Sequence, residues 1–353
     1  MKSLSKNLNS NISQQLFYLL VLVLFLRIDL IFQDNTPTGG DMGAHIVAID
    51  TFIKDFMPNF QINGWSNDWF GGYPLYYFYF PIPPLITFFL NLAFPFGVAF
   101  KIMVAMSTIL VVYSFEKLMR KTSNQFSIYG ASAGLFYVFT ESFTIYGGNL
   151  ASTLAGQYSF GYSLAFANLS IFYLIKSKNN FRFPISSIFL ALCLMSHLIP
   201  FIIYFPIYGF YWLSKKQKLN QKILSISIFL ALVSRWSISL FMNLEYTTNM
   251  SYTPFSRLED LIKEDILPII FIFFGLFIAK HKYLLKSKTF NLFDLYLISS
   301  SILLYFFVPE GALWNGRLVP FFNLGIIFLF FKAVEIFIED INLYQQGVNV
   351  LTV

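Results

Sequence analysis

Charged residues are scarce in this chain, and their scarcity excludes an ordinary soluble domain. Asp, Glu, Lys and Arg make up only 12% of the 353 residues, against about 25% in soluble globular proteins. Hydrophobic residues make up 56%, and they form recurring apolar runs of roughly 17 to 25 residues, each long enough to cross a hydrocarbon core. The composition therefore predicts an integral membrane protein, and no soluble domain of useful size remains.

Cysteine is almost absent as well. The single cysteine, Cys193, lies in an apolar run, so no intramolecular disulfide and no thiolate metal cage can form. We expect Cys193 to be an inert packing residue.

The apolar runs predict the type and number of the membrane-spanning segments. They cover about 16–33, 81–97, 99–116, 126–140, 158–175, 183–199, 200–213, 222–243, 266–280, 290–308 and 318–338. All are expected to be helical, because a lone strand cannot satisfy its backbone hydrogen bonds in lipid. We therefore predict an all-α membrane protein with about ten or eleven transmembrane helices in a single polytopic domain, residues 1–340, followed by a tail, residues 341–353.

Basic residues in the short loops predict the orientation. These loops are 117–121, 176–182, 215–218 and 280–288. Basic short loops mark the cytoplasmic side and contact anionic lipid, so the net charge of +6 does not require a nucleic-acid partner. We expect a cytoplasmic N-terminus, an uncleaved first anchor and a first extracytoplasmic loop at 34–80. One span too many then lies between this loop and 117–121, so either the run 81–97 is partly re-entrant or one basic cluster breaks the rule.

The first outer loop holds the densest set of functional candidates. Gly39 and Gly40 break the preceding run, Asp41 can cap a helix, and apolar residues recur at helical spacing until Pro58. This pattern predicts an amphipathic interfacial helix with Asp41 and His45 on one side, four residues apart. Asp41 is either a plain N-cap or a general base that takes a proton from an acceptor hydroxyl, with His45 orienting it or binding phosphate. The two roles can coexist.

Aromatic residues crowd the remainder of this loop, from Trp65 to Phe80. An interfacial belt explains them, because Trp and Tyr favour the headgroup level of a membrane. In the alternative interpretation, Trp65 or Trp69 stacks on a sugar ring while Asp68 accepts hydrogen bonds from its hydroxyls. The substrate-binding candidates here are Trp65, Asp68 and Tyr73.

A second outer segment, 141–163, is rich in glycine and small hydroxyl residues and contains Asn149. Such a segment leaves backbone N–H groups accessible to a phosphate or an acceptor, or it simply forms a flexible turn. Further on, His197 precedes Pro200 where two apolar runs meet. A lone histidine in this position is either a packing residue or a phosphate ligand.

A third outer segment, 309–324, carries Glu310, Asn315 and Arg317 just before a long apolar run. A charge that enters the bilayer centre costs roughly 2.5 to 3.5 kcal/mol, so these charges need partners. Arg317 is our first choice for holding a lipid-phosphate leaving group, because a guanidinium binds phosphate through two parallel hydrogen bonds. The alternative is a structural Glu310–Arg317 ion pair.

Six sequence blocks, taken in order, resemble a bacterial family. They are GGDMGAH (39–45), NGWSNDWFGGYPLYYFYFPIPP (63–84), GGNLASTLAGQYSF (147–160), MSHLIP (195–200), EYTTNM (245–250) and LWNGRLVPFFNL (313–324). Together they resemble the polytopic membrane proteins described as 6-pyruvoyl-tetrahydropterin synthase-related, which are similar in layout to GT-C-type glycosyltransferases. Pterin chemistry is not expected, because a pterin synthase needs clustered histidines for zinc, and His281 lies in a basic cytoplasmic loop away from His45 and His197.

The GT-C resemblance implies a multi-span enzyme of the plasma (inner) membrane that takes a sugar from a polyprenyl-phosphate donor. It also implies an acidic catalytic base in the first outer loop, a role that falls on Asp41. GT-C enzymes that use a divalent metal often carry an Asp-x-Asp pair, which this loop lacks, so no metal or other cofactor is expected. Relatives commonly continue beyond the position of Val353 into an outer domain, on which acceptor recognition would then depend.

The sequence thus favours a membrane glycosyltransferase that transfers a sugar to an extracytoplasmic glycan or lipid acceptor in cell-envelope glycan synthesis. Asp41 would deprotonate the acceptor, while Arg317 and His197 would steady the departing phosphate. Two alternatives remain open. One is a transporter or lipid flippase, with Arg235 and Arg317 along the substrate path, and the other is a non-catalytic membrane subunit of an envelope-assembly complex.

Overall fold

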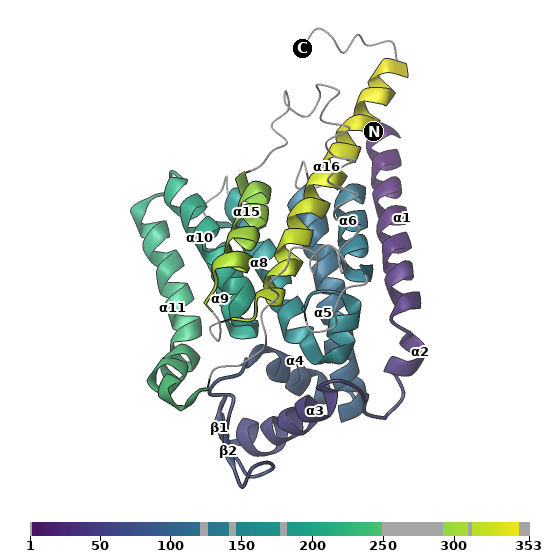
Figure 1. Ribbon diagram of the computed structural model, residues 1–353. Coiled ribbons are helices and arrows are strands. Elements are labelled where there is room, and N and C mark those ends of the chain that lie inside the picture. The colour runs from purple at the N-terminus through teal and green to yellow at the C-terminus, as the bar shows by residue number, and fades with distance from the viewer. Residues whose placement is uncertain are drawn as a thin grey trace.

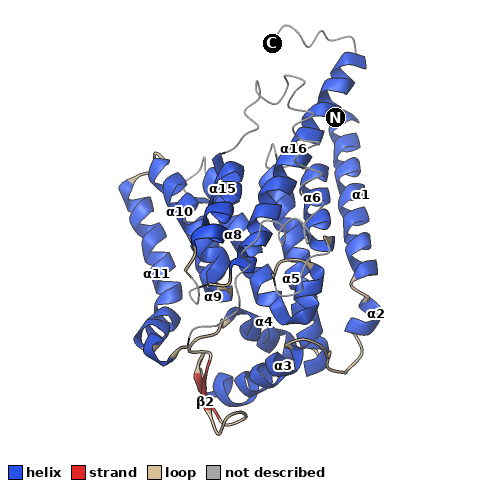
Figure 2. Cartoon of the chain, viewed as in Figure 1, coloured by secondary structure: helices blue, strands red, loops and turns tan. Residues whose placement is uncertain are grey.

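The computed structural model describes residues 2–120, 126–140, 146–176, 182–248, 292–309 and 313–345, and these are helical almost throughout (Figure 2). The upright helices are α1 (Lys2–Phe25), α5 (Phe96–Met119), α6 (Ile128–Phe139), α8 (Tyr158–Ile175), α9 (Arg182–Ser196), α10 (Leu198–Ser214), α11 (Leu219–Met242), α15 (Leu292–Phe307) and α16 (Val319–Gln345). The shorter elements are α2 (Ile28–Ile31), α3 (Met42–Thr51), the strands β1 (Gly64–Ser66) and β2 (Tyr73–Leu75), α4 (Ile82–Asn91) and α7 (Leu150–Ser152). Among these, α3, α4 and the strands lie across one end of the bundle, whereas α1 begins and α16 finishes at the opposite end (Figure 1).

The long apolar helices make this a multi-pass membrane protein, as its composition predicts. Within the described ranges, four helical stretches are long and apolar enough to cross a membrane: Phe96–Met119, Leu150–Ile175, Leu219–Met242 and Asn315–Ile338. Shorter apolar helices of 10 to 17 residues accompany them. The predicted run 266–280 lies outside the described residues.

The first apolar run is interrupted near its end. α1 stops at Phe25 and α2 starts at Ile28, because Arg27 between them adopts a left-handed conformation with φ of 51°. The Arg27 side chain forms an exposed ion pair with Asp29, with 2.7 Å between Nη2 and Oδ2. The run expected as one helix over 16–33 therefore ends in a separate short turn.

The run 81–97 does not form one membrane-spanning helix. Its helical part, α4, has ten residues and is about 15 Å long, roughly half the thickness of a hydrocarbon core. The chain then passes Pro95, the N-cap of α5, and α5 runs to the basic turn at 117–121. The surplus span of the topology prediction is thus replaced by a short helix at the end of the bundle.

The basic turns lie at the end of the bundle opposite α3. Tyr18 of α1 is hydrogen-bonded to Ser132 of α6, with 2.6 Å between the hydroxyl oxygens, and Phe25 packs on Phe139 with ring centroids 4.5 Å apart. α6 therefore runs parallel to α1 and begins at the end where α1 begins, and the basic turn 117–121 precedes it. The turn 215–218 between α10 and α11 lies at this same end (Figure 1).

The central helix α8 holds in place the turn that precedes it, Thr153–Gln157. Nearly all its side chains are buried, and polar groups tie it to α5: the Ser107 hydroxyl donates to the Tyr158 carbonyl at 2.8 Å, and the Tyr162 hydroxyl donates to the Met103 carbonyl at 2.6 Å. Residues just before α8 are thereby held rigidly against α3.

Candidate functional site

Asp41 occupies the N-cap position of α3, but its side chain makes no capping hydrogen bond. Its backbone N–H donates instead to the Ala155 carbonyl at 2.9 Å. The preceding Gly40 permits this approach, because a Cβ there would lie 2.8 Å from Ala155 Cα. The carboxylate is exposed and does not hold the helix end, so Asp41 occupies the N-cap position without the hydrogen bond of a plain N-cap.

A π-helical turn, Thr153–Gln157, lies directly against Asp41 and His45. Gly156 within it has φ of 108°, a conformation that L residues rarely adopt. A Cβ on Gly156 would lie 3.0 Å from Asp41 Cβ and 3.2 Å from His45 Cδ2. Glycine is thus required here both by the backbone conformation and by the close contact with the two candidate residues.

Gln157 joins Asp41 to Arg317. Its Nε2 donates to Asp41 Oδ2 at 3.4 Å, a long hydrogen bond, and its Oε1 accepts from Arg317 Nη1 at 2.8 Å. Because the amide donates at one end and accepts at the other, it connects a carboxylate and a guanidinium without neutralising either. Asp41, His45 and Arg317 therefore belong to one cluster, which we call the Asp41 cluster: Asp41, His45, Gly156, Gln157 and Arg317.

His45 is neutral at physiological pH. Its ring packs on Tyr79 and Tyr158, with centroid distances of 5.5 and 5.1 Å. Burial lowers the pKa of His45, although the Asp41 charge and a hydrogen bond to the Gly156 backbone act in the opposite direction. A neutral imidazole beside the carboxylate can orient a substrate through a hydrogen bond but does not neutralise Asp41.

His197 lies in the turn between α9 and α10, where it has a structural task. Its Nδ1 accepts a hydrogen bond from the Ile199 N–H at 3.2 Å and so caps α10, while its ring stacks on Phe80 at a centroid distance of 4.8 Å. Burial, with a further contribution from the charge of Arg317, lowers the pKa of His197 to about 3. The charge of Arg317 thus acts on His197, and the imidazole is neutral. His197 can therefore assist a phosphate only as a neutral hydrogen-bond donor.

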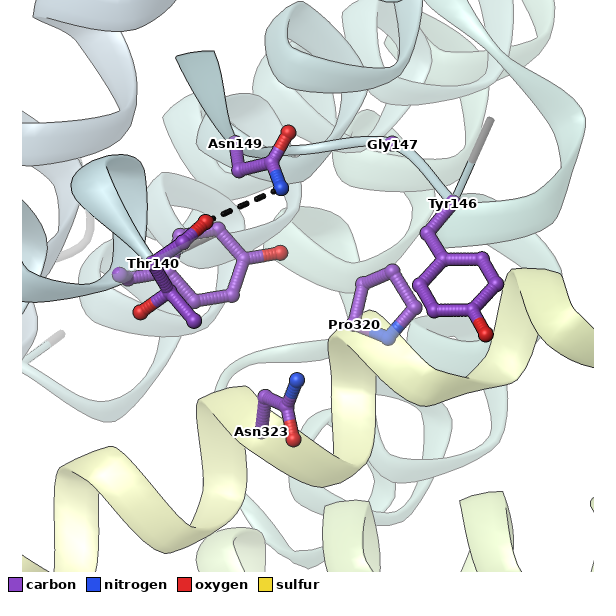
Figure 3. Close-up of a pocket in the computed structure, with 7 residues that line it drawn as sticks. Thr140, Tyr146, Gly147, Asn149, Pro320 and Asn323 are labelled. Carbon is purple, nitrogen blue, oxygen red and sulfur yellow. Dashed lines mark hydrogen bonds between the residues drawn. The ribbon is translucent and has the colours of Figure 1, made fainter. Parts of the chain in front are cut away.

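Asn149 and Asn315 make structural hydrogen bonds with backbone groups. Asn149 accepts from the Ser152 N–H at 2.7 Å and donates to the Thr140 carbonyl at 3.2 Å. Figure 3 shows it beside a cavity of about 10 Å³ shared with Thr140 and Asn323, which is large enough for one water and far too small for a sugar. Asn315 is buried and donates to the Tyr305 carbonyl at 3.2 Å.

The remaining candidates lie elsewhere. Trp65, Asp68 and Tyr73 belong to the hairpin of β1 and β2 near the far end of α3, where Asp68 Oδ2 accepts hydrogen bonds from Thr51 and Ser66. α3 is about 15 Å long, so this hairpin is not part of the Asp41 cluster. Glu310 lies outside the described residues, and so does its expected pair with Arg317.

Gln157 and Gly156 were missed by the sequence analysis as individual residues. The only signal was their place in the glycine-rich segment 141–163, for which a phosphate contact and a turn were both considered. Within that segment, the turn Thr153–Gln157 brings one amide between two distant charges.

An apolar cavity of about 370 Å³ adjoins the cluster. Met42, the residue after Asp41, contributes to its wall, together with apolar side chains of α1, α2, α5 and α7, while Lys101 supplies positive charge and Arg27 is paired with Asp29. Lys101 Nζ also donates to the Leu30 carbonyl and to Asn35 Oδ1, both at 2.7 Å, and these bonds hold α5 to the loop after α2. No residue of the Asp41 cluster lines this cavity, which neighbours the cluster through Met42, Thr153 and Leu154.

Comparison with known proteins yields a structural likeness alone. No family model matches the sequence, and no curated protein matches it. Among solved structures, the chain is similar to the crystal structure of ArnT from Cupriavidus metallidurans bound to undecaprenyl phosphate, with a TM-score of 0.55 and 14% sequence identity. The match covers 91% of this chain and 60% of that one, so the chain spans less than two thirds of its structural neighbour. This likeness supports the GT-C-like membrane fold that the sequence resemblance implies.

Proposed function

We propose that this protein is a membrane glycosyltransferase that moves a sugar from a polyprenyl-phosphate carrier to a hydroxyl of a glycan or lipid acceptor. The observation that carries the proposal is the Asp41–Gln157–Arg317 chain of hydrogen bonds. Three distant parts of the sequence supply these residues, and their proximity supports a scheme in which a carboxylate base and a phosphate-binding cation act at one point.

The proposed reaction uses each member of the Asp41 cluster once. Asp41 accepts the proton of the acceptor hydroxyl as its oxygen forms a bond to the anomeric carbon. The bond between that carbon and the carrier phosphate breaks, and its electron pair leaves with the phosphate. The Arg317 guanidinium stabilises the negative charge of the departing phosphate, and attack opposite the leaving group inverts the anomeric carbon.

Gln157 has a positioning role in this scheme. If Asp41 and Arg317 formed a direct ion pair, the carboxylate would be a weaker base and the guanidinium would be less available to phosphate. The amide between them keeps both in place while leaving their charges separate. His45, neutral and hydrogen-bonded to the Gly156 backbone, fixes the other side of Asp41.

The apolar cavity beside Met42 suits the hydrocarbon part of a lipid carrier. Its volume of about 370 Å³ falls in the range of ligand pockets, and its wall is formed mostly by apolar side chains. The similar ArnT structure is described as bound to undecaprenyl phosphate, which supports a polyprenyl phosphate as the carrier here.

The site faces the extracytoplasmic side in this proposal. The basic turns 117–121 and 215–218 lie at the end of the bundle opposite α3, and short basic loops mark the cytoplasmic side. The plasma membrane, with the Asp41 cluster at its outer surface, is then the expected location. This agrees with an acceptor assembled in the cell envelope.

Both alternative functions have testable signatures. A transporter or flippase would place Arg235 on a substrate path, but Arg235 is exposed and donates to the Phe60 carbonyl at 3.2 Å. A non-catalytic subunit would have no reason to bring Asp41, His45 and Arg317 together. The arrangement of these residues therefore favours the enzyme.

A transfer assay in membranes tests the proposal. The wild-type protein, Asp41→Asn and Asp50→Asn are each supplied with a radiolabelled polyprenyl-phosphate sugar and an envelope extract as acceptor. Asp50 is the matched control, because it lies on the same helix but forms an exposed ion pair with Lys54 at 2.7 Å, a contact worth about 0–1 kcal/mol. We expect Asp41→Asn to lose about 10²- to 10⁴-fold in rate and Asp50→Asn to retain it.

Equal transfer by the wild type and Asp41→Asn would remove Asp41 from its role, and no transfer by the wild type would overturn the function itself. The expectation that no divalent metal is required stays a prediction, which adding EDTA to the same assay tests.

A further inference from the structure

The hairpin of β1 and β2 lies at the α3 end of the molecule (Figure 1), and its segment carries exposed aromatic rings. The Trp65 residue is 61% exposed and Phe70, at the tip, is 92% exposed. Trp69 stacks on Tyr73, with ring centroids 5.9 Å apart and planes 14° apart. Of these four residues, Trp65 and Phe70 are exposed, whereas Trp69 and Tyr73 are half-buried, so the segment presents a small aromatic surface.

The Trp65 ring is packed closely against the hairpin backbone at Gly72. Gly72 lies against the Trp65 indole, because a Cβ there would be 2.6 Å from Trp65 Cε2, so the hairpin can close on the ring only with glycine at this position. Phe70, at the exposed tip, has φ of 58°, a left-handed backbone conformation of the kind found in hairpin turns.

A fixed carboxylate accompanies the rings. Thr51 of α3 and Ser66 of β1 both donate to Asp68 Oδ2, and these hydrogen bonds lower the pKa of Asp68. Asp68 is therefore an ionised acceptor at neutral pH, and its second oxygen, Oδ1, can accept hydrogen bonds from ligand hydroxyls.

Aromatic rings beside an ionised carboxylate match the two kinds of group that a carbohydrate presents, its C–H faces and its hydroxyls. The C–H face of a sugar ring packs on an aromatic face, and its hydroxyls donate to a carboxylate. A lipid surface fits less well, because an ionised carboxylate is costly to bring into a membrane. Anionic headgroups fit less well too, since residues 41–80 contain four carboxylates and one lysine.

We propose that the hairpin is a carbohydrate subsite that binds a distal part of the acceptor, so that the acceptor is a glycan or glycolipid with several sugar units. This inference rests on the proposed transferase function, because it identifies the bound glycan as the acceptor of that reaction. The spacing supplies the argument: α3 carries Asp41 at its start and contacts Asp68 through Thr51 at its end, about 15 Å away. A single sugar at Asp41 cannot reach that far, whereas an oligosaccharide can.

Steady-state kinetics on the full chain in proteoliposomes test the subsite. The acceptor is the glycolipid fraction of the envelope of the organism that makes the protein, and the variants are Trp65→Ala, Asp68→Asn and the control Tyr246→Ala. Tyr246 is 72% exposed and lies in the turn Leu244–Tyr246 after α11, outside β1 and β2. We expect Trp65→Ala and Asp68→Asn to raise the acceptor KM roughly three- to tenfold, with kcat and the donor KM unchanged, and Tyr246→Ala to match the wild type.

The outcomes separate the two proposals. An acceptor KM that stays at the wild-type value in both hairpin variants, while Asp41→Asn loses turnover, overturns the subsite and leaves the transferase standing. If the wild type transfers no sugar, the transferase fails, and quenching of Trp fluorescence by oligosaccharides released from the same envelope then decides whether the hairpin binds glycan.

Lipid vesicles provide the opposing test for the hairpin. The Trp65 contribution to fluorescence is taken as the difference between the wild type and Trp65→Phe, measured in vesicles of brominated phospholipid. We expect no quenching of that contribution. Strong quenching would show that the hairpin dips into lipid, and it would overturn the carbohydrate subsite.

Discussion

Replacing Gly156 with alanine should displace Asp41 and His45 without removing any proposed catalytic group. Gly156 has φ of 108°, and holding an L residue in such a region costs about 1–3 kcal/mol. The new Cβ would also lie 3.0 Å from Asp41 Cβ and 3.2 Å from His45 Cδ2, whereas carbon atoms in contact prefer about 3.5–4.0 Å. Asp41 and His45 must therefore shift by a few tenths of an ångström.

The expected result is a tenfold to hundredfold fall in kcat, because a misplacement of about 1 Å in a catalytic constellation can cost 10²-fold. A loss of about 1–3 kcal/mol in stability should accompany it. The assay is sugar transfer from a radiolabelled polyprenyl-phosphate donor in proteoliposomes, together with thermal unfolding of the purified protein in detergent. Gly209→Ala is the matched control, since Gly209 lies within α10 and nothing stands within 4 Å of the added Cβ.

Two outcomes would refute this reasoning. Wild-type kcat and stability in Gly156→Ala would show that the turn Thr153–Gln157 does not press on Asp41. A loss of stability with unchanged kcat would show that Gly156 serves folding alone and that the geometry of Asp41 and His45 does not limit turnover.

Two further predictions address the neighbouring residues. Arg317→Lys should lower kcat about 10- to 100-fold, because an ammonium is a point charge that cannot bind phosphate as a planar fork, and transfer rates equal to the wild type would contradict the phosphate role. His197→Asn keeps a side-chain acceptor for the Ile199 N–H but cannot titrate. The pKa of His197 is lowered from 6.5 to about 3 in the folded protein, so the unfolded chain binds its proton first and wild-type stability should fall as pH drops from 6.5 towards 3, by up to about 1 kcal/mol per pH unit. His197→Asn should flatten this part of the Tm-against-pH curve, and an unchanged slope would show that another group causes it.

Sequence alone predicted several local features correctly, because they depend on short-range chemistry. The helix predicted after Asp41 begins at Met42, since a glycine break followed by apolar residues at helical spacing is a local signal. The breakdown of the span count around 81–97 was also visible in the sequence, because the positive-inside bias counts charges along the chain.

Other features were beyond the sequence because they depend on contacts between distant segments. Asn149 and Asn315 have the residue type of ligand-binding groups, yet both are committed to backbone carbonyls. Nothing in the sequence marks Gln157 above other glutamines. Its importance arises only when the turn before α8 passes between α3 and the start of α16.

What the sequence determined by itself is the class of protein: the hydrophobic runs require membrane-spanning helices, and the polar residues between those runs limit where chemistry can occur. What the tertiary structure decided is which of those polar residues work together. It joined Asp41 to Arg317 through Gln157 and kept Asp68 and Trp65 on a separate hairpin. The physical reason is that hydrophobicity acts residue by residue along the chain, whereas a hydrogen bond between side chains more than a hundred residues apart exists only after the helices have packed.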